Sequence, residues 1–173
     1  TPPSAVDLGI NRDIISLNLI GEGEEALLMA GESGEAKVWS STDGGWTWTS
    51  SQKPPSGDSL TYVVMAPDFT SSGKAYATTS GTESAFSYTT DGGITWNQLS
   101  LVDTDISQIA DLSLSPNYRH DNTLFMVTRS SGGNHSLWRC LNGGTVWERV
   151  YFSPLANADT IDQVELSPQY GNG

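Results

Sequence analysis

Positively charged side chains are scarce in this sequence. It contains 8 Lys and Arg residues against 20 Asp and Glu residues, which gives a formal net charge of −12 at pH 7. Nucleic acids and anionic membrane surfaces bind proteins through clustered Lys and Arg. The sequence also lacks an apolar run long enough to cross a membrane as a helix. We therefore expect no nucleic-acid partner and no membrane insertion.

Cysteine and histidine are almost absent. Cys140 is the one cysteine, so no internal disulfide can form. His120 and His135 are expected in loops, and their spacing is not that of metal ligands. The sequence therefore predicts no metal site and no bound cofactor.

What the sequence does contain is one short turn motif in three copies. The motif occupies residues 41–48, 89–96 and 140–147, and we call these copies box 1, box 2 and box 3. Their closing residues are Trp48, Trp96 and Trp147, so consecutive copies lie 48 and 51 residues apart. A regular period of this length is typical of repeat architectures.

A second landmark repeats with nearly the same period. Four apolar segments end in a turn-forming residue, namely residues 17–21, 63–67, 112–116 and 164–168. The last three continue alike, with Pro followed two residues later by Phe or Tyr. Because two separate landmarks share one period, chance recurrence is a poor explanation, and we infer a structural repeat of about fifty residues.

Each repeat is expected to contain four short strands. Segments rich in β-branched and aromatic residues alternate with Gly, Pro, Ser and Asp clusters, and no stretch shows sustained helical periodicity. The expected strands are residues 16–20, 26–30, 37–41 and 47–50; 61–65, 74–79, 85–89 and 95–99; and 110–114, 123–128, 136–140 and 146–151. The pattern predicts an all-β protein built from four-stranded antiparallel blades of a β-propeller.

The boxes have the composition of tight turns between the third and fourth strands. Paired glycines reach backbone angles that other residues adopt only at a cost, and a short Asp or Asn side chain accepts hydrogen bonds within the turn. The Trp is expected to begin the fourth strand and to bury its large apolar face. The residues assigned to this structural role are Ser41, Asp43, Gly45, Trp48, Thr89, Asp91, Gly93, Trp96, Asn142, Gly144 and Trp147.

The pattern Ser/Thr-x-Asp-x-Gly-x-Thr-Trp resembles the Asp-box (BNR) repeat family of β-propellers. The resemblance covers roughly residues 13–170, and box 3 departs from it at Cys140, Asn142 and Val146. In that family the boxes are a folding device and are usually remote from the active site. The recurring Ser-Pro-x-Tyr segment is similar to that of exported bacterial proteins, which implies an extracellular or cell-surface location.

The number of repeats is too small for a usual ring. We expect a single segment, residues 1–173, with repeats at about 13–57, 58–105 and 106–155 and the first strand of a fourth at 161–173. The smallest common propellers have four blades. The sequence therefore predicts an incomplete or open propeller, which would associate through its open blade edges or with missing blades of a longer chain.

The resemblance extends to two kinds of glycosidase, which gives an enzymatic alternative. The Arg-Ile-Pro signature of sialidases is absent, and most of the five arginines fall in the third repeat rather than on separate blades. Xyloglucan-degrading relatives use two carboxylates across a cleft. The acidic residues near the expected starts of first strands are Asp58, Asp105, Asp111 and Asp162. Solvated strand-end carboxylates explain these positions better than a catalytic pair does, so no catalytic residue is assigned.

Among the other tryptophans, Trp46 is the candidate for contact with a partner. It occupies the variable slot of box 1, which should point outward. Trp39 and Trp138 occupy equivalent positions in third strands, one residue after an apolar position, so they should face the opposite side of the sheet. Both are expected to pack against neighbouring blades.

The sequence thus favours a non-catalytic interaction or scaffold module that binds protein or glycan. Two alternatives stay open. One is a fragment of a sialidase-like or xyloglucanase-like glycoside hydrolase with an incomplete active site. The other is an assembly factor resembling the propellers of photosystem II biogenesis. Fold alone does not choose among them.

Overall fold

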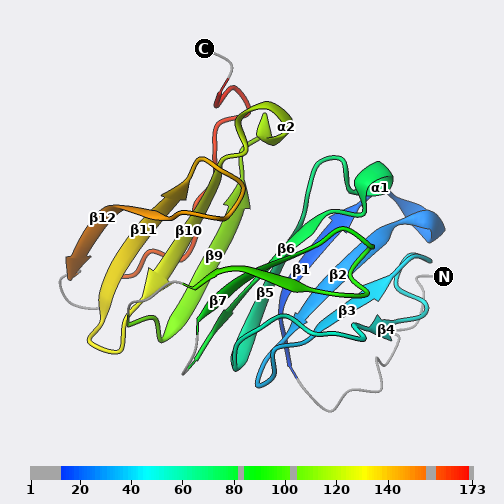
Figure 1. Ribbon diagram of the computed structural model, residues 1–173, viewed down its shortest axis with the longest axis horizontal. Helices are drawn as coiled ribbons and strands as arrows, with labels where there is room; N and C mark the ends of the chain where they lie inside the picture. The colour runs from blue at the N-terminus through cyan, green and yellow to red at the C-terminus, as the bar shows by residue number, and fades with distance from the viewer. Residues whose placement is uncertain (1–12, 82–83, 102–104, 155–158, 172–173) are drawn as a thin grey trace.

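The protein consists of three four-stranded antiparallel sheets arranged side by side (Figure 1). The computed structural model describes residues 13–81, 84–101, 105–154 and 159–171. Each sheet takes its four strands from consecutive parts of the chain, in sequential order. We call the sheets the first, second and third blade.

The first blade contains β1 (Ile14–Ile20), β2 (Leu27–Glu32), β3 (Val38–Ser41) and β4 (Thr49–Ser50), with a short 3-10 turn at Gly23–Glu25. The second contains β5 (Ser59–Met65), α1 (Phe69–Ser72), β6 (Ala75–Ser80), β7 (Ala85–Thr89) and β8 (Asn97–Leu101). The third contains β9 (Gln108–Leu114), α2 (Tyr118–Asp121), β10 (Leu124–Arg129), β11 (Asn134–Cys140) and β12 (Glu148–Pro154).

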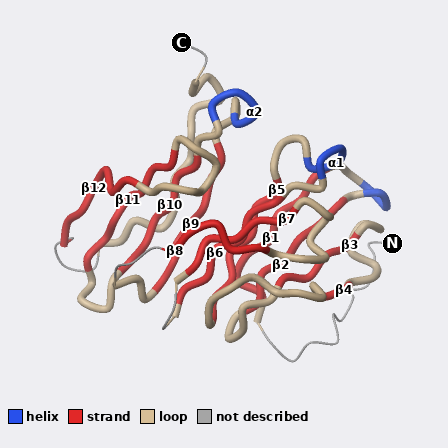
Figure 2. The backbone as a smooth tube through the Cα atoms, in the orientation of Figure 1, coloured by secondary structure: helices blue, strands red, loops and turns tan. Residues whose placement is uncertain are grey.

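The expected all-β architecture of four-stranded units is confirmed, with two local corrections. The fourth strands begin one residue after Trp48, Trp96 and Trp147, because each Trp is the last residue of its turn and not the first of the strand. The connection between first and second strands in the second and third blades forms a single helical turn, α1 or α2. Four residues are too few to produce a helical period in the sequence. Both turns lie at the upper end of the blades (Figure 2).

The hydrophobic core lies between blades. One cluster joins Met29 and Val38 of the first blade to Val63, Met65 and other residues of the second. A larger cluster joins the second blade to the third through buried aliphatic and aromatic side chains, including Tyr76, Phe86, Leu124, Met126 and Trp138. Each sheet is therefore stabilised mainly by its neighbours, as expected for stacked repeats.

Two buried tyrosines contact each other at the second junction, which is the contact between the second and third blades. The rings of Tyr76 and Tyr118 meet edge to face with their centroids 5.7 Å apart, and their hydroxyl groups hydrogen-bond to each other. Burial raises the pKa of both phenols above its ordinary value. Both side chains therefore stay neutral near pH 7, and the bond between their hydroxyls satisfies two buried polar groups at once.

Polar side chains of the first blade hold the inner strand of the second. The Val63 N–H donates to Ser16 Oγ at 3.1 Å, and the Met65 N–H donates to Asn18 Oδ1 at 3.0 Å. Ser16 Oγ also donates to the carbonyl of Thr61 at 3.0 Å. These contacts cover the edge of β5 that has no neighbouring strand, and we call this arrangement the inner clasp.

The segment that was expected to begin a fourth repeat lies where a first strand would lie, but it does not form a strand. Residues 159–167 are not assigned to a strand, whereas the Val164 N–H donates to Asp111 Oδ2 at 2.8 Å. Asp111 pairs with Val127 across the strands as Ser16 pairs with Gly31, so Asp111 and Ser16 occupy equivalent positions. The bond from Val164 to Asp111 therefore corresponds to the bond from Val63 to Ser16 in the inner clasp. No second strand for this segment to pair with lies among the described residues, and positions 172–173 fall outside them.

The turn after this segment also copies its counterparts. The Tyr170 N–H donates to the Ser167 carbonyl at 2.8 Å, as the Tyr118 N–H donates to that of Ser115 at 3.0 Å. The Tyr170 ring meets Phe125 edge to face at 5.7 Å, which parallels the contact between Tyr118 and Tyr76. Residues 161–171 thus lie on the third blade in the place that the start of a fourth blade would take.

At Gly31 the first and second blades approach each other too closely for a larger side chain. A Cβ added to Gly31 would lie 1.9 Å from the Thr61 carbonyl oxygen, and no unusual backbone angle accompanies it. We expect Gly31→Ala to lower the free energy of unfolding by about 1–3 kcal/mol or more, because the blades must separate to admit the methyl group. Denaturant titration measures the loss.

Gly132→Ala is the matched control, since a Cβ there meets its nearest atom at 3.6 Å and the backbone angle is again ordinary. The control should stay within about 0.5 kcal/mol of the native protein. Equal losses in the two variants would show that the glycine at position 31 is not required by close packing.

Candidate interaction site

The first two boxes are closed by the same set of hydrogen bonds. In box 1, Ser41 Oγ donates to Asp43 Oδ1 at 2.7 Å and accepts from the Gly45 N–H at 2.9 Å. The Thr47 N–H and Oγ1 donate to the two oxygens of Asp43 at 2.9 and 2.6 Å, and Trp48 Nε1 donates to the Gly45 carbonyl at 2.9 Å.

Box 2 repeats these bonds with little change in length. The two bonds from Thr95 to Asp91 measure 2.9 and 2.6 Å, and those of Thr89 to Asp91 and Gly93 measure 2.7 and 3.1 Å. Trp96 Nε1 donates to the Gly93 carbonyl at 3.2 Å. The Asp carboxylates are therefore engaged within their own turns, as the sequence suggested.

Hydrogen bonding changes the acidity of the box carboxylates. The bonds from Thr47, followed by that from Ser41, lower the pKa of Asp43 to about 2. The pKa of Asp91 is also lowered, although burial acts in the opposite direction there and the bonds from Thr95 and Thr89 outweigh it. Both carboxylates are ionised at neutral pH and are poorly suited to act as general acids.

Box 3 keeps the turn with fewer bonds. Cys140 Sγ contacts Asn142 Oδ1 at 3.0 Å and accepts from the Gly144 N–H at 3.0 Å, and the Val146 N–H donates to Asn142 Oδ1 at 3.0 Å. Val146 has no hydroxyl for the second oxygen contact of boxes 1 and 2. Trp147 Nε1 is buried and has no hydrogen-bond partner among the described residues.

Two of the three box tryptophans pack on the preceding blade. Trp96 is 1% exposed and belongs to the cluster that contains Met29 and Val38 of the first blade. The Trp147 ring meets Phe86 of the second blade edge to face at 5.1 Å. Trp48 and Trp147 are both partly buried.

The structure places Trp39 and Trp138 in matching hydrogen bonds. Trp39 Nε1 donates to Glu32 Oε2 at 2.9 Å, and Trp138 Nε1 donates to Thr128 Oγ1 at 2.8 Å. Trp138 is buried at the second junction, as expected, with the Arg149 guanidinium 4.4 Å from its ring centroid. Trp39 is only partly buried and has the Lys37 ammonium 4.9 Å from its ring. Both indoles therefore have local partners.

The variable slot of each box faces solvent. Trp46 is 50% exposed in box 1 and Ile94 is 49% exposed in box 2, and Thr145 occupies the slot in box 3. Trp46 therefore has the exposure that contact with a partner needs. Its function as a binding residue stays a prediction.

A groove runs across the inner strands of all three blades. It has a volume of about 280 Å³ and is lined by residues 15–18 of β1, 62–64 of β5 and 111–112 of β9. We call it the axial groove, because the three first strands of successive blades meet there (Figure 1). No pattern in the sequence marks this site directly, because its residues come from three segments about fifty positions apart and converge only in the fold.

Tyr62 and Asp111 give the axial groove its chemistry. Burial, followed by the negative charge of Asp111, raises the pKa of Tyr62, so the phenol stays a neutral donor and acceptor at pH 7. Asp111 is partly exposed and accepts from the Leu112 N–H at 2.9 Å as well as from Val164. Asn18 and Ser16 add amide and hydroxyl groups. The groove can therefore bind donors, and a positive charge above all.

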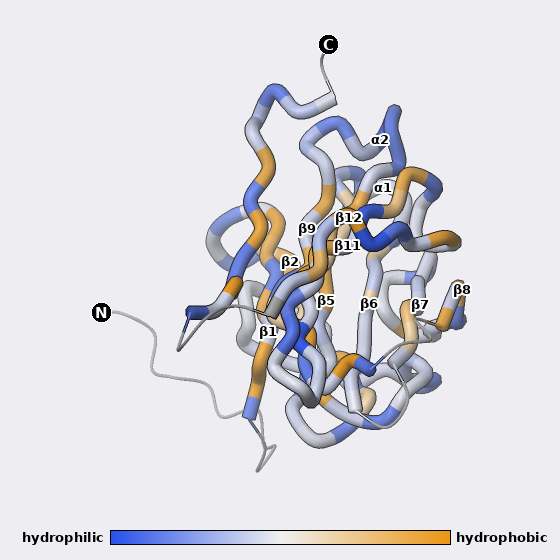
Figure 3. The backbone as a smooth tube through the Cα atoms, turned by 90° about the vertical axis from the view of Figure 1, so that its left-hand side faces the viewer, coloured by the Kyte–Doolittle hydropathy of each residue, from blue (hydrophilic) through white to orange (hydrophobic). Residues whose placement is uncertain are grey.

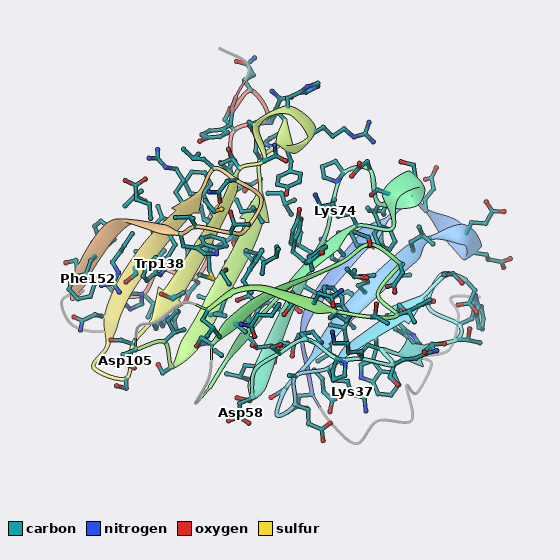
Figure 4. The ribbon with its side chains drawn as sticks, in the orientation of Figure 1. Lys37, Asp58, Lys74, Asp105, Trp138 and Phe152 are labelled. Atoms are coloured by element: carbon teal, nitrogen blue, oxygen red, sulfur yellow. The ribbon has the colours of Figure 1, made fainter. Side chains whose placement is uncertain are left out.

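The four carboxylates proposed for an enzymatic site do not gather in this groove. Asp58 and Asp105 lie at the lower end of the blades, opposite α1 and α2 (Figure 4). Asp105 accepts from Ser131 Oγ at 2.7 Å, and Asp162 pairs with Arg129. Among the described residues that line the groove, Asp111 is the acidic one.

Metal-binding geometry is missing from the described ranges. They contain no group of three or more His, Cys, Asp or Glu side chains placed to hold an ion. The expectation that both histidines lie in loops is wrong. His120 is in α2, and His135 is buried in β11 with its Nδ1 accepting from the Ile161 N–H at 3.3 Å. Within the same ranges, no helix has the length and apolarity needed to cross a membrane.

A family model described as Sortilin, neurotensin receptor 3 (Sortilin-Vps10) matches residues 36–154. The chain belongs to the Sortilin-Vps10 family. The match covers all of the second and third blades, and it begins just before β3 of the first. A comparison with curated protein sequences finds no match.

Solved structures similar to this member of the Sortilin-Vps10 family are propeller proteins. YCF48 bound to D1 peptide aligns with a TM-score of 0.61 and 18% identity over 87% of this chain and 43% of that one. The GH74 enzyme of Niastella koreensis aligns at 0.54 and 22% over 73% and 19%. The GH74 xyloglucanase of Xanthomonas campestris aligns at 0.52 and 18% over 72% and 19%. The chain spans less than half of each structure, and identities this low show the fold alone.

The box 1 hydrogen bonds can be tested through the acidity of Asp43. Thr47→Val copies the residue of box 3 and removes the largest cause of the low pKa, so the pKa of Asp43 should rise from about 2 toward the ordinary 3.8. NMR titration of the Asp43 carboxyl carbon measures it. The native carboxylate stabilises the fold above the unfolded pKa, and this contribution falls as the pH drops from about 4 to 2.

Thr49→Val is the control for this titration. Thr49 is an exposed threonine in β4, two residues away, and its hydroxyl is not among the groups that lower the pKa of Asp43. The Asp43 midpoint should therefore stay at about 2 in this variant. If both substitutions leave the midpoint unchanged, the bonds from Thr47 are not its cause.

Proposed function

We propose that this chain is a non-catalytic interaction module of an exported or cell-surface bacterial protein, and that its axial groove binds an extended segment of another protein. The observation that carries this proposal is the groove itself. It crosses three inner strands, measures about 280 Å³ and contains the half-buried side chains of Tyr62 and Asp111. An extended segment that crosses the groove would contact the inner strands of all three blades at once.

Charge indicates which segments would bind. The protein carries a net charge of −12, and the Asp111 carboxylate faces the groove. A negative field attracts positively charged partners and speeds their encounter. We therefore expect the bound segment to carry Lys or Arg, with one side chain close to Asp111 and Tyr62.

The similar proteins support binding of a polypeptide. The YCF48 structure is of a complex with a D1 peptide, and the Sortilin-Vps10 description names a receptor. A related proposal is a role in the assembly of another protein, for which a groove that holds an extended segment would also serve. Either role needs the same first step, which is capture of a peptide.

The groove is tested by selecting a phage-displayed dodecapeptide library on the immobilised chain. Selected peptides should be rich in Lys and Arg, and Asp111→Asn should weaken their binding about tenfold, which corresponds to about 1.4 kcal/mol. The substitution preserves side-chain shape and removes the charge. Fluorescence anisotropy with labelled synthetic copies of the selected peptides measures the affinity.

Asp58→Asn is the matched control, since it removes one negative charge from an exposed site outside the groove. It should change the affinity less than twofold at moderate salt, because surface charges are screened over about 10 Å. Peptides that bind both variants equally well, or a selection that yields none, would refute the groove as a protein-binding site.

Glycan is the second kind of partner that the surface supports. Trp46 is 50% exposed at the tip of box 1, and an exposed indole offers a flat apolar face to a sugar ring. This site is separate from the axial groove in sequence and belongs to a single blade. Loss of glycan binding in Trp46→Ala, with peptide binding kept, would assign it.

The enzymatic alternative draws its support from the GH74 structures. Those enzymes share the fold over about a fifth of their length. Hydrolysis needs two carboxylates about 5–10 Å apart in an open site, whereas Asp105, Asp111 and Asp162 are each engaged with local donors. We expect the isolated chain to release no reducing sugar from xyloglucan. Hydrolysis that Asp58→Asn or Asp105→Asn abolishes would reverse this assignment.

A further inference from the structure

One side of the first blade is apolar and uncovered. Leu17 and Leu19 of β1 are 60% and 54% exposed, and Leu28 and Trp48 beside them are only partly buried. Leu19 pairs with Leu28 across the strands, so both side chains lie on the same face. Figure 3 shows hydrophobic segments along β1 at the surface of the molecule. We call these four residues the open face.

The same positions are buried in the other two blades. Leu17 pairs with Ala30 as Val63 pairs with Ala77 and Leu112 pairs with Met126, so the three residues are equivalent. Val63 is 6% exposed and Leu112 is 8% exposed. The difference of more than fifty percentage points arises because each of the latter is covered by the blade before it.

The two junctions between blades show which residues cover such a face. Met29 and Val38 of the first blade pack on the second, and Tyr76 and Phe86, at the equivalent positions of the second blade, pack on the third. At the first junction the inner clasp of Ser16 and Asn18 adds hydrogen bonds to the backbone of β5. A covering blade therefore offers two bulky apolar residues and short polar side chains at fixed positions.

The far side of the third blade has this composition. Phe125 is equivalent to Met29 and Tyr76, and Leu137 is equivalent to Val38 and Phe86. Asp111 and Ser113 occupy the positions of Ser16 and Asn18. We call this the far face. Asp111 already accepts from the Val164 N–H, so the clasp of the far face is able to hold an inner strand.

We propose that the open face binds the far face of a second copy of this chain, head to tail. The inner strand β1 of one copy would replace residues 161–171 on the far face of the other, with Leu17 and Leu19 in place of Val164 and Leu166. Leu17 of the open face and Asp111 of the far face also line the axial groove. The association would therefore compete with peptide binding for these two residues.

Two features favour exchange of that segment. Residues 159–167 form no strand, so they lose no ladder of hydrogen bonds when they leave. A complete blade also covers Leu28 and Trp48 in addition to the leucines of β1, and apolar burial contributes about 25 cal/mol per Å². Head-to-tail contacts between identical chains close into a ring when their rotation allows it.

Sedimentation equilibrium tests the association. We expect a concentration-dependent species of about twice the 18.5 kDa chain mass, and a stronger association at high salt because both copies are acidic. The double variant Leu17→Asp with Leu19→Asp should weaken the association at least a hundredfold. Leu101→Asp, which changes a leucine of equal exposure (60%) on β8, should leave it unchanged. Thermal unfolding verifies that each variant is folded.

Mixing separates a head-to-tail contact from a face-to-face one. Leu137→Asp damages only the far face, so alone it should fail to associate. Mixed with the Leu17, Leu19 double variant, it should form one heterodimer, since that pair retains one intact open face and one intact far face. Removal of residues 159–173 should strengthen the association of the native chain. A chain that stays monomeric with and without these residues, a Leu137→Asp variant that associates normally, or an equal loss in Leu101→Asp would each overturn the proposal.

Discussion

The fit of each box against the preceding blade is the contact on which the rest of the structure depends. A Cβ on Gly93 would lie 2.8 Å from the Met29 methyl group, and one on Gly144 would lie 2.0 Å from Phe86. Both glycines have positive φ angles, of 93° and 99°. Glycine is thus required there twice, for the backbone angle of the turn and for the approach of the neighbouring side chain. The same residues of the box therefore form the turn and contact the neighbouring blade.

The two blade junctions solve this packing problem in different ways. The first uses the inner clasp and modest apolar residues such as Met29 and Val38. The second uses aromatic contacts across the junction, with Tyr76 against Tyr118 at 5.7 Å and Phe86 against Trp147 at 5.1 Å. Tyr62 and Val64 of β5 take the positions that the short polar residues Ser16 and Asn18 have in β1. The backbone of the repeat can therefore stay the same while the side chains at each junction differ, provided that a similar volume of apolar side chains is buried there.

Much of this fold could be predicted from the period and composition of the sequence, and the reason is that each blade is specified locally. The turn chemistry of Asp43 and Asp91 depends on residues within four positions, so it was visible in the sequence. The axial groove was not, because Tyr62 and Asp111 meet only after three blades have packed. Polar residues such as Ser16 and Asn18 within apolar strands were the available signal, and they mark the inner edge rather than the groove.

The groove lies where the repeat is least regular. At the first junction the clasp fills the space between inner strands. At the second, Tyr62 takes the position of Ser16, and the Leu112 N–H donates to the neighbouring Asp111 carboxylate at 2.9 Å. Asp111 also lines the groove, where its charge adds to burial in raising the pKa of Tyr62. The position that holds a short polar residue in the first blade thus holds a tyrosine paired with a carboxylate in the groove, and departures from local regularity of this kind are where functional sites are expected.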